Sequence, residues 1–388
     1  MRVVNLKQPD LDSWQDPRWM IIFATEWPDS ELLRGIRQRF PKLAIFGSSS
    51  FHGIFTQYGY QQGVFGLLNE GSESKTRRAR FIACDDDADW QALAYEAALE
   101  LGPIDNPERD VILMQATPGH EERIIDGVIE ALGENTHIFG GSAGHSRELA
   151  KPFIIFGEEI CTSGFWLISL RDEFAPQCLM LMGGYLPTLN SGVVTQSSGR
   201  VIHTIDFRPA VEVYNEWTNA VFEPYLRRGG DLPKHTAMYP LGRTLDGEPH
   251  CGFWLYHPIS VTLGTKSLTL FAEFPVNTRI TMMRGSERML IHRMHAVTQE
   301  ALDSVDASRV MGAIVIFCAG CATIIQDDMK EVCAHVQEVL GDIPFIGCSS
   351  LGEQGRIRGF KRSYHGNMMC GVILFMKQDV VSTLHELN

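Results

Sequence analysis

The fold of this chain is decided by the run Ala44-Ile45-Phe46-Gly47-Ser48-Ser49, because the same pattern returns twice. The two other copies read His137-Ile138-Phe139-Gly140-Gly141-Ser142 and Pro344-Phe345-Ile346-Gly347-Cys348-Ser349. Each is a short apolar run with a glycine near its end and a serine two residues after that glycine. Short apolar runs bounded by glycine are typical of buried strands.

The same signals surround each copy in the same order: strand, helix, strand, glycine turn and returning strand. The first strands are expected at 19–24, 111–114 and 313–317, and the returning strands at 63–68, 164–168 and 371–375. A crossover through a helix makes two strands parallel, whereas a returning strand pairs antiparallel. The chain is therefore expected to be α/β (α+β), with repeated β-α-β-plus-strand units that form mixed sheets covered by helices.

The middle of the chain follows another pattern, which predicts β-hairpins and one helix. Two strand runs flank Ser197-Ser198-Gly199, a short turn whose glycine can take positive φ. A helix is expected to begin at Pro209, because proline suits the first helical position. We place the domain boundary near Asp206, which predicts domains 1–206 and 207–388.

Composition narrows the classes of function. The 388 residues include 34 basic and 47 acidic side chains, a formal net charge of −13, so neither a nucleic acid nor a membrane is the expected partner. Nine cysteines without a disulfide framework favour a reducing compartment. The first residues lack the apolar core of an export signal, and the longest uncharged apolar stretch, 310–325, falls short of the roughly 20 residues of a spanning helix. These features predict a cytoplasmic protein.

A series of short motifs runs through most of the chain in a fixed order. They are Phe139-Gly140-Gly141-Ser142-Ala143-Gly144, Gly184-Tyr185-Leu186-Pro187, Val194-Thr195, Ile205-Asp206, Pro209-Ala210, Val213-Tyr214, Pro240-Leu241-Gly242, Phe317-Cys318-Ala319-Gly320, Gly347, Gly352-Glu353 and His365. In this order the chain resembles the FIST family, in which an N-terminal and a C-terminal FIST domain form a sensory module.

The resemblance implies a protein that is not an enzyme. Family members are described as input modules for small ligands, with amino acids proposed, and some bacterial members resemble haem-dependent nitric oxide sensors that act on histidine kinases. The chain is therefore expected to bind a small molecule and to signal through a separate partner, a histidine kinase or a cyclic-dinucleotide enzyme.

Two positions depart from the family pattern. Cys321 stands where arginine usually follows the Cys-x-Gly step, and His257 appears in place of a second arginine. Both differences remove positive charge from the region where a ligand would lie, which counts against an anionic ligand bound as in other members.

The glycine turns are candidate ligand-binding sites, because mixed α/β sheets gather ligands just after buried strands. The candidate residues are Gly47, Ser49, Gly140, Ser142, Gly347 and Ser349, to which the family motif adds Glu353. Alternatively, each glycine only allows a sharp strand exit and each serine satisfies backbone groups in a turn.

Ser142 also lies in a Gly-x-Ser-x-Gly pattern, which is typical of the nucleophile of serine hydrolases. No long helix follows it, since Pro152 ends the stretch, and serine recurs at the same place in all three copies although a nucleophile is needed only once. A cytosolic serine hydrolase that uses Ser142 is therefore the alternative function.

Haem b is the cofactor that the resemblance favours, and three histidines are its candidate ligands. His257 lies in an apolar strand, His52 follows the first glycine turn among apolar residues, and His365 matches a family histidine. We prefer His257 as the metal ligand, because a neutral imidazole there replaces a fixed cation beside residues that could bury a porphyrin face. The alternative is that each histidine is a satisfied structural side chain.

Cys318-Ala319-Gly320-Cys321 has the spacing of a redox thiol pair. No second Cys-x-x-Cys accompanies it, which opposes a structural zinc site. The simpler interpretation is a small buried residue and a free thiol.

Overall fold

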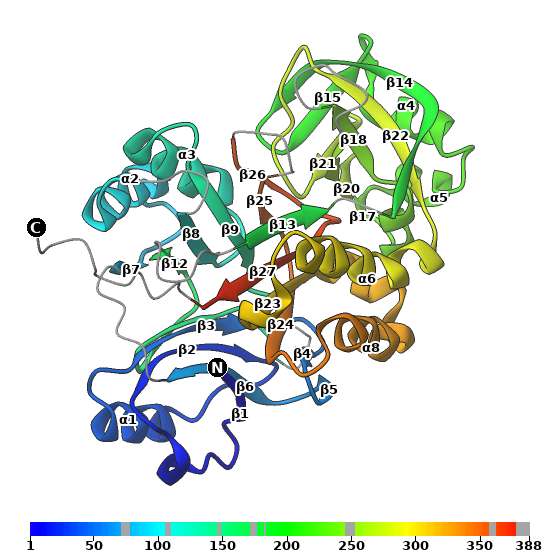
Figure 1. The fold of residues 1–388 in the computed structure, drawn as a ribbon. Coiled ribbons are helices and arrows are strands. Elements are labelled where there is room, and N and C mark those ends of the chain that lie inside the picture. Colours follow the sequence, from blue (N-terminus) through cyan, green and yellow to red (C-terminus); the bar gives the residue numbers. More distant parts are fainter. Residues whose placement is uncertain are drawn as a thin grey trace, which may run out of the picture.

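The computed structural model describes residues 1–70, 78–104, 110–145, 149–170, 177–181, 184–244, 253–356 and 362–377. In this part of the chain, three six-stranded sheets form the body and a fourth, nine-stranded sheet adjoins it (Figure 1). None of the helices described has the length and apolarity to cross a membrane.

The three six-stranded sheets share one strand order: an edge strand, the returning strand, the first strand, the second strand and a two-stranded hairpin. The first sheet contains β1 (Arg2–Asn5), β6 (Val64–Glu70), β2 (Pro17–Ala24), β3 (Ala44–Ser49), β10 (Ile154–Phe156) and β11 (Glu159–Cys161). The second contains β7 (Arg78–Ala83), β12 (Gly164–Leu170), β8 (Val111–Ala116), β9 (His137–Ser142), β25 (Glu353–Gly355) and β26 (Tyr364–Gly366). The third contains β13 (Gln177–Leu181), β27 (Cys370–Met376), β23 (Val310–Cys318), β24 (Phe345–Ser350), β4 (Ile54–Thr56) and β5 (Gly59–Gln61).

This order confirms the repeat predicted from the sequence. The strand pairs β2–β3, β8–β9 and β23–β24 are parallel, and each returning strand pairs antiparallel with the first strand of its unit. The runs that contain Phe23, Met114 and Phe317 therefore occupy equivalent places in three sheets. The expected α/β class with mixed sheets is correct.

The hairpin that completes each sheet comes from a different unit. The β10–β11 hairpin of the second unit pairs with β3, the β25–β26 hairpin of the third unit pairs with β9, and the β4–β5 hairpin of the first unit pairs with β24. The exchange is cyclic, so the three units form a pseudo-threefold arrangement within one chain. Each hairpin also covers a strand edge that would otherwise be open to pairing with another chain.

Helices cover the outer faces of the three sheets (Figure 1). They are α1 (Ser30–Arg39) on the first sheet, α2 (Trp90–Leu101) and α3 (Glu121–Leu132) on the second, and α6 (Glu287–Asp303) and α8 (Met329–Leu340) on the third, with α7 (Ala319–Ile324) directly after β23. Short 3-10 turns occur at Leu11–Ser13, Lys234–Met238, Ala307–Arg309 and Gln326–Asp328.

Alternation along β2 shows how a strand is buried on both faces. Trp19, Ile21 and Phe23 join the central core between the sheets, whereas Met20 and Ile22 pack with Leu33 and Ile36 of α1. A strand covered on both sides reads as a continuous apolar run, which is the pattern that the sequence showed.

Capping side chains fix where several helices begin. Asp29 accepts hydrogen bonds from backbone N–H groups at the start of α1, and Asp89 and Ser286 do the same for α2 and α6. Such caps satisfy N–H groups that have no partner within the helix.

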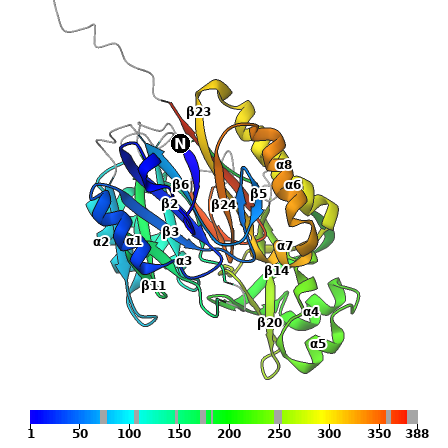
Figure 2. The same cartoon turned by 90° about the horizontal axis from the view of Figure 1, so that it is seen from below.

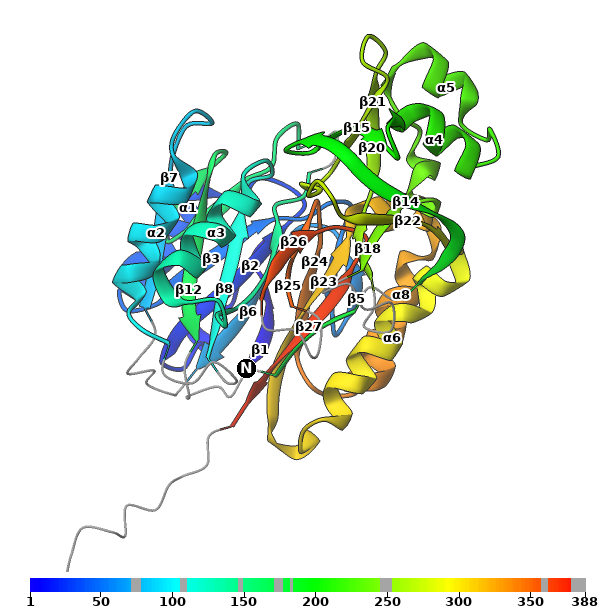
Figure 3. The same cartoon turned by 90° about the horizontal axis from the view of Figure 1, so that it is seen from above.

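The fourth sheet projects from one end of the body together with two helices (Figures 2 and 3). Its strands are β14 (Tyr185–Ser198), β15 (Val201–Ile205), β16 (Arg208–Pro209), β17 (Gly230–Asp231), β18 (Leu241–Thr244), β19 (Phe253–Tyr256), β20 (Pro258–Thr262), β21 (Ser267–Leu270) and β22 (Arg279–Gly285), and its helices are α4 (Ala210–Trp217) and α5 (Glu223–Arg228). The predicted β14–β15 hairpin is present, but Ser197 and Ser198 still belong to β14 and the turn is at Gly199 and Arg200. Helix α4 begins one residue after the predicted start, because Pro209 is its N-cap residue.

Candidate functional site

The three serines of the repeated motif are joined by a ring of backbone hydrogen bonds. The Ser49 carbonyl accepts from Gly144 N–H at 2.9 Å, the Ser142 carbonyl from Leu351 N–H at 3.1 Å, and the Ser349 carbonyl from Phe51 N–H at 2.9 Å. Each donor lies two residues after the serine of another unit, so the ring follows the pseudo-threefold symmetry. All three serines are buried.

The three glycines lie within strands β3, β9 and β24 and control how closely the neighbouring strand approaches. A Cβ atom on Gly140 would lie 1.9 Å from the Met114 carbonyl oxygen. On Gly47 it would lie 2.3 Å from the Ile22 carbonyl oxygen, and on Gly347 it would lie 2.1 Å from a methyl group of Val315. These contacts give each glycine a packing role. Their predicted role in ligand binding stays a prediction.

Side-chain hydrogen bonds distinguish the serines. Ser49 Oγ accepts from the Phe153 N–H at 2.9 Å, a backbone role within the first sheet, and the Ser349 N–H donates to Ser50 Oγ at 2.9 Å. Ser142, in contrast, bonds to two polar side chains of a buried network, those of Glu121 and Gln354. Of the three repeated serines, Ser142 of the second unit is therefore the one that belongs to a network of polar side chains.

We call this group the Ser142 network: Ser142, Glu121, Gln354, His365 and Arg200. Ser142 Oγ donates to Glu121 Oε1 at 2.5 Å and accepts from Gln354 Nε2 at 3.0 Å. His365 Nδ1 lies 3.1 Å from Gln354 Nε2, and its Nε2 lies 3.9 Å from Glu121 Oε2. The network joins the start of α3 and the end of β9 to the hairpin β25–β26.

Arg200 neutralises the acidic side of the network. Its guanidinium donates to Glu121 Oε2 at 2.7 Å and to Glu122 Oε2 at 2.6 Å. Burial by itself would raise the pKa of Glu121, but the charges of His365 and Arg200 and the Ser142 hydroxyl outweigh burial and lower the pKa to about 2. Ligand atoms of Glu121, Glu122 and His365 lie within 4.8 Å of one another, which is metal-like spacing. Arg200 already supplies the positive charge there, so we assign no metal to this group.

Strand β25 separates the Ser142 network from a second polar cluster. Successive side chains of a strand point to opposite faces, so Gln354 faces the Ser142 network and Glu353 faces the other way. Glu353 accepts from Ser350 Oγ at 2.6 Å and from Met369 N–H at 3.1 Å. Burial raises the pKa of Glu353 to about 8, and these hydrogen bonds offset burial only in part.

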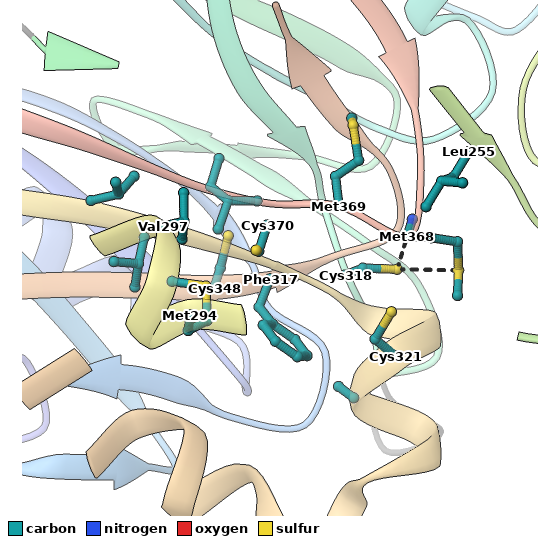
Figure 4. Close-up of a cluster of buried hydrophobic side chains, with 14 of the residues drawn as sticks. Leu255, Met294, Val297, Phe317, Cys318, Cys321, Cys348, Met368, Met369 and Cys370 are labelled. Atoms are coloured by element: carbon teal, nitrogen blue, oxygen red, sulfur yellow. Dashed lines mark hydrogen bonds between the residues drawn. The ribbon is translucent and has the colours of Figure 1, made fainter. Parts of the chain in front are cut away.

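The second group, which we call the sulfur cluster, consists of Cys318, Cys321 and Met368 (Figure 4). Cys318 Sγ lies 3.9 Å from Met368 Sδ, and Cys321 Sγ lies 3.3 Å from the Tyr185 hydroxyl. Burial raises the pKa of Cys318 well above its usual value. Burial would raise that of Cys321 as well, but the Cys318 thiol, Arg293 and Tyr185 together lower it to about 6. Cys321 is therefore the more acidic thiol of the pair.

The sulfur cluster lies near a positive charge, that of Arg293, which belongs to none of the sequence motifs. Arg293 of α6 is buried, donates to the carbonyls of Met368 at 2.8 Å and Met369 at 3.3 Å, and lies 4.5 Å from the Phe317 ring centroid. Cys321 and His257 do remove two family arginines from this region, as the sequence indicates. Packing of α6 on the third sheet nevertheless brings in another arginine, which the sequence analysis did not anticipate.

His257 lies next to the sulfur cluster, between β19 and β20. Its Nε2 is 3.0 Å from Thr236 Oγ, and its backbone N–H donates to Asn367 Oδ1 at 2.9 Å. Burial lowers the pKa of His257 to about 4, so the ring is neutral near pH 7. A Cβ atom on Gly320 would lie 3.5 Å from His257 Nδ1, Cys318 Sγ and Met368 Sδ.

The three candidate haem ligands lie in different surroundings. A porphyrin bound to His257 Nδ1 would have to displace Cys318 and Met368, so the residues around His257 do not fit haem. His52 is half-buried after β3 with a φ of 65°, and its ring centroid is 3.9 Å from that of Phe51. His365 belongs to the Ser142 network. The structure thus places His257 beside the sulfur cluster and His365 within the Ser142 network.

Several residues of both clusters were missed from the sequence. Glu121, Arg200, Arg293 and Met368 lie outside the motifs whose residues they contact. Tyr185 lies within a family motif, but no role was predicted for its side chain. Gln354 directly follows Glu353 of another family motif, which was a weak signal. Buried charged residues on amphipathic helices carry no local pattern that separates them from solvent-exposed ones.

Comparison with known proteins divides the chain into two domains. The FIST N domain model matches residues 18–208, and the FIST C domain model matches residues 210–356. Among curated proteins, no match is found. A solved structure titled "Crystal structure of Chorismatase at 1.08 Angstrom resolution" is similar at a TM-score of 0.31 and 10% identity over 97% of each chain, a likeness too low to carry an argument.

Proposed function

The chain belongs to the FIST family, with a FIST N domain followed by a FIST C domain, and from this premise we propose that it senses a small ligand and signals to a separate partner. FIST domains are small-ligand sensory domains of signalling proteins. The observation that carries the proposal is the match of both domains across residues 18–356.

Strand β25 is the element best placed to couple the two domains. It belongs to the FIST C domain but completes the sheet of β8 and β9 in the FIST N domain. Its neighbouring residues Gln354 and Glu353 contact the Ser142 network and the surroundings of the sulfur cluster, respectively. A ligand that favours one position of β25 would shift the population of both clusters together.

The contacts of Ser142 support a non-catalytic protein over the alternative serine hydrolase. A catalytic serine needs a general base within hydrogen-bond reach, most often an imidazole nitrogen. Here Gln354 Nε2 lies between Ser142 Oγ and His365, and Ser142 donates to a carboxylate. A fluorophosphonate probe is therefore expected to leave the folded protein unlabelled. Labelling that disappears in Ser142→Ala would favour the hydrolase.

Ligand binding can be tested by thermal unfolding with each of the twenty amino acids in turn. A ligand at a hundred times its Kd stabilises the native state by about 2.7 kcal/mol, which raises Tm measurably. We expect at least one amino acid to raise Tm and the Gln354→Ala variant to lose the shift. The matched control is Gln299→Ala on α6, where the amide bonds only to Asp303. A flat response in the wild type to all twenty would contradict an amino-acid ligand.

The sequence also predicts that the ligand is haem b and that the protein senses nitric oxide. This stays a prediction, and the residues packed around His257 argue against haem binding there. An absorption spectrum after haem reconstitution tests it, with His257→Ala and His52→Ala as variants. A Soret band is expected only if a histidine binds iron.

The partner and the compartment are also proposals. A histidine kinase or a cyclic-dinucleotide enzyme would be recognised by a change in its activity when this protein is added. A cytoplasmic location is supported by the free thiols of Cys84, Cys161, Cys318, Cys321, Cys333, Cys348 and Cys370.

A further inference from the structure

Three soft donor atoms surround one point beside Gly320. A Cβ atom on Gly320 would lie 3.5 Å from each of Cys318 Sγ, Met368 Sδ and His257 Nδ1. These residues come from the end of β23, the segment before β27 and the link between β19 and β20. Because glycine has no side chain, a space of about one methyl group remains between a thiol, a thioether and an imidazole.

Hydrogen bonds on the far side of His257 direct a lone pair into this space. Thr236 Oγ lies 2.8 Å from the Pro233 carbonyl oxygen and 3.2 Å from that of Pro258, and both can only accept its single hydrogen. Thr236 Oγ is therefore assigned as the acceptor of the His257 Nε2 hydrogen at 3.0 Å. Nδ1 then carries the lone pair. It is buried without a hydrogen-bond partner, although buried polar atoms are almost always paired. A hydrogen bond at the other ring nitrogen, which fixes the tautomer, is typical of metal-binding histidines.

The two sulfur atoms lie at a separation that one ion can bridge. They are 3.9 Å apart, and at thiolate–metal bond lengths of about 2.3 Å this separation corresponds to an angle of about 115° at the metal, close to trigonal. Met368 is held in place by its N–H, which donates to Cys318 Sγ at 3.3 Å. Its φ of 65° is rare for a residue other than glycine, and such backbone strain clusters at functional sites.

We propose that Cys318, Met368 and His257 bind a soft monovalent metal ion, Cu(I). Thiolate and thioether sulfur select Cu(I), whereas zinc and harder cations rarely accept a thioether. When the Cu–S bond forms, the Cys318 thiol releases its proton to solvent and no oxidation state changes. Cys321 is also a free thiol and lies beside Cys318, so it can add a third sulfur (Figure 4). The site does not depend on the sensory role proposed above.

The test is an anaerobic titration of the reduced full-length chain with Cu(I) against a chromophoric Cu(I) chelator. We expect one equivalent to bind, and we expect Cys318→Ser and Met368→Leu each to weaken affinity by more than about 10-fold. The matched control is Met369→Leu, a buried methionine next in sequence whose side chain points away from Cys318 in Figure 4. X-ray absorption at the copper edge should show sulfur and imidazole scattering, and His257→Phe should remove the imidazole part.

Three results would overturn the copper site. They are no Cu(I) binding by the reduced protein, unchanged affinity in both sulfur variants, and Zn(II) binding as tight as Cu(I) binding. Circular dichroism and Tm report whether each variant folds. Met368→Leu conserves side-chain volume, so its affinity decides the outcome even if Cys318→Ser does not fold.

Discussion

At the residue scale, the repeated glycines set the spacing of the parallel strand pairs. Gly47, Gly140 and Gly347 face a partner on the first strand of their own unit, where no room exists for a methyl group. Protein interiors are packed as densely as organic crystals, so even one added carbon must move a strand or strain the backbone.

Gly140→Ala is therefore expected to destabilise the protein by about 1–3 kcal/mol, because its Cβ would lie 1.9 Å from the Met114 carbonyl oxygen. The control is Gly35→Ala in α1, where a Cβ meets nothing within 4 Å. There alanine should stabilise by about 0.5–1 kcal/mol, because glycine weakens helix interiors. Urea unfolding measures both. Equal effects of the two variants would contradict the close-approach argument.

Glu121 is the residue whose charge should make stability depend on acid pH. Its pKa falls from the ordinary 4.5 to about 2 in the folded chain. Its contribution is therefore complete above pH 4.5 and is lost as pH falls toward 2. Glu121→Gln should cost about 1.5–3 kcal/mol at neutral pH, because Arg200 loses one of its two carboxylate partners, and the cost should shrink between pH 4.5 and 2.

The measurement for Glu121 is denaturant unfolding at a series of pH values. Glu26→Gln serves as the control, because Glu26 is exposed and pairs only with Lys7 in a surface salt bridge, so its effect should stay within about 0.5 kcal/mol. A cost of Glu121→Gln that stays constant from pH 7 to pH 3 would mean that the carboxylate has no special electrostatic role.

At the element scale, the exchanged hairpins close the sheets. Hairpin β4–β5 lies early in the chain but pairs with β24, and Phe55 of β4 packs against Tyr60 and Phe317. Without this hairpin, β24 would be an open edge strand. The stability of the third sheet should therefore depend on a residue of the first unit.

Phe55→Ala is expected to cost about 3–5 kcal/mol and to speed amide hydrogen exchange in β24 more than in β9. The reason is that the lost ring packs against Phe317 of β23 and Tyr60 of β5, both of the third sheet. Tyr58→Ala in the same hairpin is the control, since Tyr58 is 65% exposed and should have little effect. Uniform exchange changes in β9 and β24 would show that the sheets respond as one unit.

At the scale of the whole molecule, the two FIST domains share their sheets. The third sheet takes β4, β5 and β13 from the first 206 residues, and the second sheet takes β25 and β26 from the last part of the chain. The boundary between the two domains in the sequence therefore does not divide the sheets of the structure.

Fragments 1–206 and 207–388 should each fail to fold when produced alone, because each lacks strands that complete its sheets. Co-produced fragments should associate and unfold cooperatively. Circular dichroism and size-exclusion chromatography measure both results. A fragment that unfolds cooperatively by itself would contradict the interdependence of the two halves.

The sequence by itself determined the repeated unit, its strands and helices, and the parallel and antiparallel pairs. These features follow from periodicity and turn residues within about 30 neighbouring positions, which local physics fixes. The two FIST domains, in contrast, were recognised from the resemblance of ordered motifs to a known family. Single candidate residues such as Ser142, Glu353 and His365 could also be named from the sequence, because they lie in family motifs.

Only the tertiary structure decided which hairpin completes which sheet and which charges meet inside. Gln354 and Ser142 are 212 residues apart, and Arg200 and Glu121 are 79 apart. Hairpin exchange is invisible in the sequence because all three hairpins could cover any equivalent strand edge. The buried position of Arg293 could not be predicted from the sequence either. Its partners are backbone carbonyls and thiols that come close to it only through long-range packing.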